Sequence, residues 1–131
     1  MTTEVSTAKH KVIIDEVAQM GGKDSGANPL ETLLASLAGC KNATANAVAR
    51  EMEFDLKGIT FTIEGEFDPR GFKGDSSVRT YFETVWIEAN VSTSEPEERV
   101  KDLQRQVEQR CPVYNLLKAA NVTLHDTWSK A

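Results

Sequence analysis

The chain has 131 residues, of which 40% are hydrophobic and 27% are charged, and its formal net charge at pH 7 is −5. This length suits a single domain, residues 1–131, with a sizeable hydrophobic core. The acidic balance argues against binding to nucleic acid or to an anionic membrane. No segment approaches the roughly 20 consecutive apolar residues of a membrane span, and the polar start lacks the apolar core of a signal peptide. We therefore expect a cytoplasmic protein.

A strand, a loop and a long helix are predicted first. The β-branched run at 9–15 predicts a strand, and the glycine-containing segment at 21–27 predicts a turn. Asn28 is a suitable N-cap for a helix, and Glu31 can complete a capping box with it. The helix is expected to run to about Met52. Its apolar residues recur at helical spacing and predict a buried stripe: Leu30, Leu33, Leu34, Leu37, Thr44 and Val48. Small residues cover much of the rest, which indicates a central helix packed on several sides.

Two strands and a long connection follow. The segment at 58–67 alternates apolar and polar residues, which predicts a strand with one buried face. The segment at 80–91 carries apolar residues on both faces, so we expect helices or a second subunit to cover both. The connection at 68–79 is long for a hairpin and is a candidate flap. Glu64 and Glu66 form a carboxylate pair, but the alternation places both on the exposed face, where acid–base catalysis is not expected.

The last third of the chain predicts two helices and a closing strand. Ser94 and Glu97 match a second capping box, and the helix that they would start carries its apolar residues inward. Pro112 directly follows Cys111 and predicts a break there, before a short helix at 112–120. The segment at 122–128 then predicts a strand. Because strands and helices do not alternate regularly, the pattern predicts an α+β fold with mainly antiparallel sheets.

The two cysteines of the chain, Cys40 and Cys111, both lie toward the inner face of a predicted helix. One interpretation is that each is a small buried side chain that fills a packing site. The other is a redox pair that meets where the helices cross. Cytoplasmic thiols are normally reduced, so a disulfide there would be catalytic or redox-sensing. The spacing alone leaves both interpretations open. With only His10 and His125 in addition, the chain has no zinc-type ligand pair, and no metal site is expected.

Two motifs carry a family resemblance. Two segments occur in the order found in the OsmC/Ohr family: GGKDSGANPLETLLASLAGC, which ends at Cys40, and later QRCPVYNLL, which contains Cys111. These are the osmotically inducible and organic hydroperoxide resistance proteins. The resemblance covers nearly the whole chain from about Lys9. It implies an intertwined homodimer, in which sheets wrap central helices and the active sites lie at the subunit interface.

The resemblance also implies a catalytic activity without a metal, haem or other cofactor. Cys40 matches the peroxidatic cysteine of the family, and Cys111 matches the resolving one. Cys40 would reduce a small organic hydroperoxide and become a sulfenic acid, and Cys111 would condense with it to a disulfide. An external dithiol, which in the family can belong to a lipoylated protein, would restore both thiols.

The chain departs from the family pattern in the groups that activate the peroxidatic cysteine. Family members use an arginine from an upstream strand, whereas no arginine precedes Arg50 here. They also use a glutamate directly after the Asn-Pro pair, where this chain has Leu30. Glu31 follows one residue later and, at about 100° per residue, lies on the opposite side of the helix from Cys40. Five residues are candidates to supply the missing positive charge: Lys9, Lys11, Lys41, Arg70 and Arg79.

Two functional hypotheses follow from these residues. The first is a thiol-dependent peroxidase that acts through Cys40 and Cys111. The alternative is a non-catalytic or redox-sensing relative that binds a small apolar ligand at the dimer interface. The two cysteines favour the first hypothesis, and the missing arginine and glutamate favour the second.

Overall fold

The computed structural model describes all 131 residues and confirms the α+β class. The chain forms two compact units, Met1–Ser36 and Leu37–Ala131. Helix α1, Pro29–Met52, begins in the first unit and continues through the second. None of the helices combines the length and the apolar character needed to cross a bilayer.

The first unit contains a β-hairpin. Strand β1, Thr3–Ser6, pairs antiparallel with β2, Lys11–Ile14. Sequence analysis predicted β2, with bounds somewhat wider than observed, and missed β1, whose polar composition gives little strand signal. A short 3-10 helix, η1 at Ala18–Met20, follows the hairpin and precedes the predicted turn.

The Asp15 carboxylate organises the glycine-containing loop of the first unit. It is 2% exposed, and it accepts hydrogen bonds from the hydroxyls of Ser25 and Thr2 and from three backbone amides, those of Glu16, Lys23 and Ser25. These bonds hold the pKa of Asp15 well below its usual range, and the bond from the Ser25 hydroxyl has the largest effect. A Cβ atom on Gly22 would lie 2.0 Å from the Glu16 carbonyl oxygen, so the loop can approach this closely only with glycine there.

Helix α1 begins and ends as the sequence predicts. The Glu31 amide donates to Asn28 Oδ1 at 2.8 Å, and the Asn28 amide donates to Glu31 Oε2 at 3.0 Å, which confirms the capping box. The predicted stripe is only partly buried: Leu37 and Val48 are in the core, whereas Leu30 is 38% exposed. The buried residues of the helix all lie in its later part, between Leu37 and Ala49.

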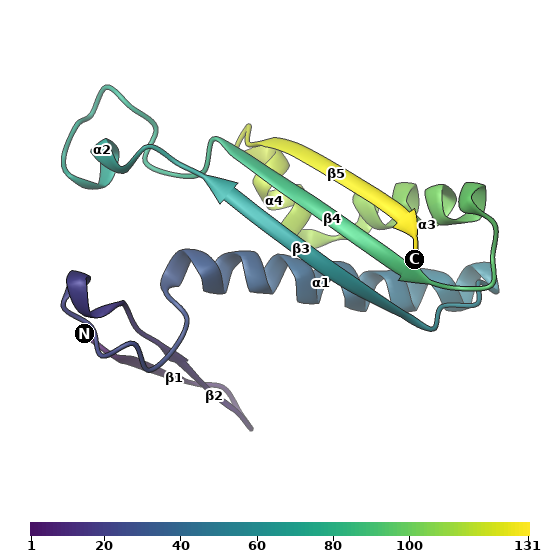
Figure 1. Ribbon diagram of the computed structural model, residues 1–131, viewed down its shortest axis with the longest axis horizontal. Helices are drawn as coiled ribbons and strands as arrows, with labels where there is room; N and C mark the ends of the chain where they lie inside the picture. Colours follow the sequence, from purple (N-terminus) through teal and green to yellow (C-terminus); the bar gives the residue numbers. More distant parts are fainter. The chain divides into compact units, whose positions relative to one another are not determined.

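A three-stranded sheet forms the body of the second unit. Figure 1 shows its strands in the order β3, Gly58–Glu66, then β4, Thr84–Ser92, then β5, Thr123–Lys130. The pair β3–β4 is antiparallel and the pair β4–β5 is parallel. A parallel neighbour needs a crossover, which helices α3, Glu97–Arg110, and α4, Pro112–Ala119, provide. The sheet is therefore mixed, and β5 is its parallel member.

The two faces of this sheet differ in burial. Alternate residues of β4 are buried, namely Val85, Ile87, Ala89 and Val91. The opposite face exposes Glu64 and Glu66, as predicted, and leaves Trp86 40% exposed beside His125, on which it stacks at 5.9 Å between ring centroids. Helices of this chain therefore cover one face of β4, and the expectation that a second subunit covers the other face stays a prediction.

Two connections also differ from expectation. The segment between β3 and β4 contains a short helix, α2 at Pro69–Phe72, whose N-cap is Asp68. The second predicted capping box is wrong. Helix α3 begins after Pro96 with no side-chain cap, because the Ser94 hydroxyl donates instead to Asp55 Oδ2 at 2.6 Å.

Candidate active site

The structure brings Cys40 and Cys111 together within the second unit. Cys40 lies in the middle of α1 and is partly exposed, whereas Cys111 is fully buried, and both are free thiols. The Cys111 thiol donates a hydrogen bond to the Cys40 sulfur, and the two Sγ atoms are 3.1 Å apart. Small local movements would close this gap to a disulfide. The two thiols are therefore in direct contact, and Cys40 provides the sulfur that accepts the hydrogen bond.

Cys111 lies at the joint between α3 and α4. It is the C-cap of α3 and the N-cap of α4, with extended backbone geometry, as the following proline predicts. The Asn115 side-chain amide donates both to the Cys111 carbonyl at 2.8 Å and to the Glu108 carbonyl at 2.9 Å. Asn115 therefore ties the end of one helix to the start of the next and fixes the position of the buried sulfur.

A buried lysine lies next to Cys40 in the sequence. Lys41 is 0% exposed, and its ammonium group forms an ion pair with Asp126 Oδ2 on β5 at 2.6 Å. The ammonium also lies 4.0 Å from the centre of the Tyr114 ring and 5.7 Å from that of Trp128, distances at which an aromatic face stabilises a cation. Burial of a charge is costly unless it is paired, and these contacts supply the pairing.

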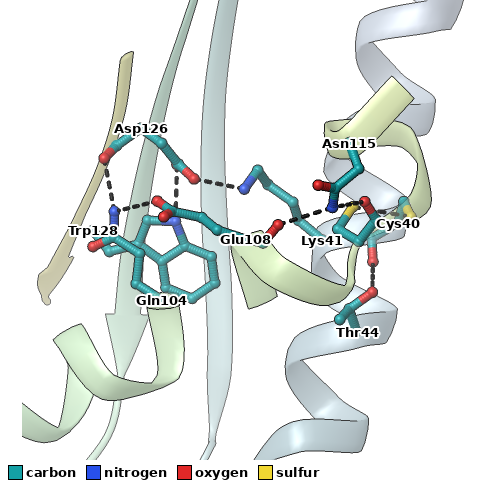
Figure 2. Close-up of polar contacts among 9 residues, drawn as sticks. Cys40, Lys41, Thr44, Gln104, Glu108, Asn115, Asp126 and Trp128 are labelled. Carbon is teal, nitrogen blue, oxygen red and sulfur yellow. Dashed lines mark hydrogen bonds and ion pairs between the residues drawn. The ribbon is translucent and has the colours of Figure 1, made fainter. Parts of the chain in front are cut away.

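Further polar groups extend this ion pair into a network, which we call the Lys41 cluster: Lys41, Gln104, Glu108, Tyr114, Asp126 and Trp128. Figure 2 shows Lys41 pointing from α1 toward Asp126, with Gln104 and Glu108 on the neighbouring helix. The Trp128 indole donates to Asp126 Oδ1 at 2.9 Å. The Gln104 amide donates to Glu108 Oε1 and to the Asp126 carbonyl, both at 2.8 Å. The cluster thus joins α1, α3, α4 and β5.

Burial raises the pKa values of three groups in and near the cysteine pair, namely Cys111, Glu108 and Tyr114. It raises the pKa of Cys111, and the hydrogen bond to Cys40 raises it further, while a backbone hydrogen bond from Tyr114 and the charge of Lys41 act in the opposite direction. Burial also raises the pKa of Glu108, and the neighbouring Asp126 adds to that effect, although the bond from Gln104 opposes it. For Tyr114, burial raises the pKa to about 12. Tyr114 therefore stays neutral, and Cys111 retains its proton near neutral pH.

Lys41 differs in its surroundings from the other four residues that are candidates to supply the missing positive charge. Arg70 forms an exposed ion pair with Asp68. Arg79 donates to two backbone carbonyls, one of them that of Asn121 at 3.2 Å. Lys9 and Lys11 belong to the first unit, where Lys11 pairs with Glu4. Lys41 is the candidate whose charge lowers the pKa of Cys111, against the larger effect of burial.

Sequence reasoning missed Asp126, Glu108, Gln104 and Tyr114 as parts of this site. One signal was available for Lys41. It lies four residues after Leu37 and four before Ala45, both fully buried, so helical spacing places it within the apolar stripe. Such a lysine needs a partner of opposite charge inside the protein. The sequence does not identify that partner, because Asp126 lies 85 positions away on another element.

Comparison with known proteins identifies relatives of this fold. A family model described as OsmC-like protein matches residues 22–125. A curated protein from Mycoplasma genitalium named hydroperoxide reductase is 33% identical over 95 residues, which are 72% of this chain but only 64% of that relative. The match thus spans less than two thirds of the relative's length.

Solved structures agree on the architecture. An OsmC-like protein from Mycoplasma pneumoniae superposes with a TM-score of 0.85 at 18% identity, covering 99% of this chain and 89% of that one. An organic hydroperoxide resistance protein from Legionella pneumophila gives a TM-score of 0.71 at 17% identity, covering 98% and 95%. At these identities the likeness establishes the fold.

Proposed function

Because the chain belongs to the family of OsmC-like proteins, we propose that it is a thiol-dependent peroxidase that reduces organic hydroperoxides through Cys40 and Cys111. The observation that carries the proposal is the 3.1 Å separation of the two sulfurs. The name of the curated relative, hydroperoxide reductase, supports the same substrate class. We propose further that residues 1–131 form a single OsmC-like domain.

The proposed cycle has three chemical steps. In the first, the Cys40 thiolate attacks the terminal oxygen of the hydroperoxide; the O–O bond breaks, Cys40 becomes a sulfenic acid, and the released alkoxide takes up a proton to give an alcohol. In the second, the Cys111 sulfur attacks the sulfenic acid, which forms the Cys40–Cys111 disulfide and releases water. In the third, an external dithiol is oxidised to its own disulfide and returns both cysteines to thiols.

The environments of the two thiols support these roles. Cys40 accepts the hydrogen bond and is partly exposed, which suits the sulfur that meets the peroxide. Cys111 is fully buried and holds its proton, which suits the sulfur that acts second. A cytoplasmic location and a reductant such as a lipoylated protein fit this chemistry, because the cycle needs a supply of reduced dithiols.

Consumption of peroxide tests the proposal. We expect the protein to consume an organic hydroperoxide, such as cumene hydroperoxide, when dihydrolipoamide is supplied, and to form one intramolecular disulfide when it is not. The assay would follow peroxide loss and free thiols together. An absence of peroxide loss, with both thiols intact after exposure, would overturn the peroxidase proposal and favour the non-catalytic alternative that binds a small apolar ligand.

We also propose that the protein is a homodimer. Several large apolar side chains of the second unit are exposed: Phe72 is 75% exposed, Leu116 66%, Tyr81 50% and Trp86 40%. Apolar surface of this kind is typical of an interface with another protein. We expect sedimentation equilibrium at micromolar concentration to give the mass of two chains. A folded species with the 14.5 kDa mass of one chain under those conditions would contradict the proposal.

A further inference from the structure

The break at Cys111 leaves one backbone carbonyl of α3 without its helical partner. In a continuous helix, the carbonyl of Glu108 would accept a hydrogen bond from the amide of residue 112. That residue is Pro112, which has no N–H group. The side-chain amide of Asn115 donates to the Glu108 carbonyl at 2.9 Å in its place (Figure 2). A side chain of α4 thus supplies the bond that the backbone lacks at the end of α3.

The same side-chain amide also holds the backbone of Cys111. It donates at 2.8 Å to the Cys111 carbonyl, which accepts a further bond from the Asn115 backbone amide at 3.0 Å. On the other side, the Cys111 amide donates to the Val107 carbonyl at 2.9 Å. Both backbone groups of Cys111 are therefore bonded, although its ψ of 114° lies outside helical geometry. These bonds restrict the backbone that carries the buried sulfur.

The position of this sulfur matters most in the second step of the proposed cycle. The two Sγ atoms are 3.1 Å apart and must approach to about 2.05 Å to form a disulfide. Cys40 lies inside a regular helix, whereas Cys111 lies at the joint between two helices. A joint that is already ordered loses little conformational entropy when the bond forms. If the disulfide itself had to order the backbone of one residue, its equilibrium constant would fall by roughly tenfold.

We propose that Asn115 is a positioning residue for the second step: it holds the joint of α3 and α4 so that Cys111 closes the disulfide before a second peroxide molecule reacts at Cys40. This inference rests on the proposed peroxidase function for its purpose. The Cys40 sulfenic acid has two fates. Condensation with Cys111 forms the S–S bond and releases water, whereas reaction with a second hydroperoxide gives a sulfinic acid and an alcohol. A loosened joint slows only the first of these reactions.

Thiol–disulfide exchange tests the inference without any peroxide. The protein would be equilibrated with mixtures of lipoamide and dihydrolipoamide, in which the disulfide of lipoamide is reduced as the cysteine pair is oxidised. Acid quenching and mass spectrometry would then give the fraction of Cys40–Cys111 disulfide. We expect Asn115→Ala, which loses both side-chain bonds, to lower the equilibrium constant for the protein disulfide by roughly tenfold.

A serine at the same position separates the two bonds of Asn115. Its hydroxyl can donate to the carbonyl four residues earlier, as the Thr44 hydroxyl does to the Cys40 carbonyl at 2.8 Å. Asn115→Ser would therefore keep the bond to the Cys111 carbonyl and lose the one to the Glu108 carbonyl. We expect it to lower the equilibrium constant by about threefold, which corresponds to the loss of one ordinary hydrogen bond.

Asn46→Ala is the matched control. The Asn46 side-chain amide also donates to a carbonyl four residues earlier, at 2.9 Å, but it lies on the exposed surface of α1. We expect its loss to leave the equilibrium constant unchanged. An unchanged constant in Asn115→Ala, or an equal decrease in Asn46→Ala, would overturn the inference. If Asn115→Ala does not fold, Asn115→Ser decides alone: a lower constant supports the inference, and an unchanged one overturns it.

Over-oxidation provides the second measurement. With an excess of organic hydroperoxide and dihydrolipoamide, we expect Asn115→Ala to accumulate sulfinic acid on Cys40 roughly tenfold faster per turnover than the wild-type protein. An unchanged rate of over-oxidation, with peroxide turnover intact in the wild type, would overturn the inference even if the exchange constant falls. A lower exchange constant in Asn115→Ala together with no peroxide turnover in the wild type would overturn the proposed function and leave the positioning of Cys111 by Asn115 supported.

Discussion

Cys40→Ser is expected to abolish peroxide turnover, whereas Cys111→Ser is expected to permit one oxidation and then stop. The first variant lacks the sulfur that attacks the peroxide. In the second, Cys40 becomes a sulfenic acid, but no neighbouring thiol lies 3.1 Å away to condense with it. An excess of peroxide would then oxidise Cys40 further, to a sulfinic and finally a sulfonic acid.

Mass spectrometry measures this difference directly. After one equivalent of an organic hydroperoxide, the wild-type protein should lose two hydrogens, while Cys111→Ser should gain oxygen on Cys40. Steady-state turnover of both variants should fall to the background rate of the free dithiol. Full turnover by either serine variant, or oxygen added to Cys111 in the wild type, would show that the two roles are assigned wrongly.

Lys41→Met is expected to lower the free energy of unfolding by about 3–5 kcal/mol. The substitution leaves the Asp126 carboxylate, which is 3% exposed, without its cation inside the protein. The double variant Lys41→Met with Asp126→Asn should recover more than half of this loss. It removes both charges and still offers an oxygen to the Trp128 indole, which bonds Asp126 Oδ1 in the native protein.

Denaturant unfolding at one fixed protein concentration would measure these differences. Lys118→Met serves as the control, because its side chain is exposed and we expect a change within about 0.5 kcal/mol. A double variant that is less stable than Lys41→Met alone would show that the ion pair is not the source of the loss. A stability of Lys41→Met equal to that of the control would show that Lys41 is not paired in solution.

Local rules predicted the elements well where the deciding interactions lie close in the sequence. The capping box of α1 depends on Asn28 and Glu31, three positions apart, and both of its hydrogen bonds form. The break before Pro112 depends on one neighbour and also forms. The capping box at Ser94 does not form because the helix begins only after Pro96, and the Ser94 hydroxyl donates to the distant Asp55 instead.

The candidate site was predictable only in part for the same reason. Two cysteines on apolar helices suggested a pair, and the structure provides the short distance that the sequence could not. The supporting groups come from a different strand and a different helix, and the residues next to Asp126 and Glu108 in the sequence do not mark either of them as part of a site. A lysine within an apolar stripe was the one sign that a buried charge network exists.

The parallel placement of β5 has a consequence for how the protein is made. During synthesis Lys41 emerges from the ribosome 85 residues before Asp126, the carboxylate that neutralises it. Until β5 pairs with β4, the ammonium group of Lys41 on α1 has no carboxylate partner. Burial of that face of α1 is then unfavourable, because it would bury an unpaired charge. Contacts of such long range form late in folding and slow it. We therefore expect the paired sulfurs to be among the last features assembled, and newly made chains to expose both thiols to chance oxidation before the site exists.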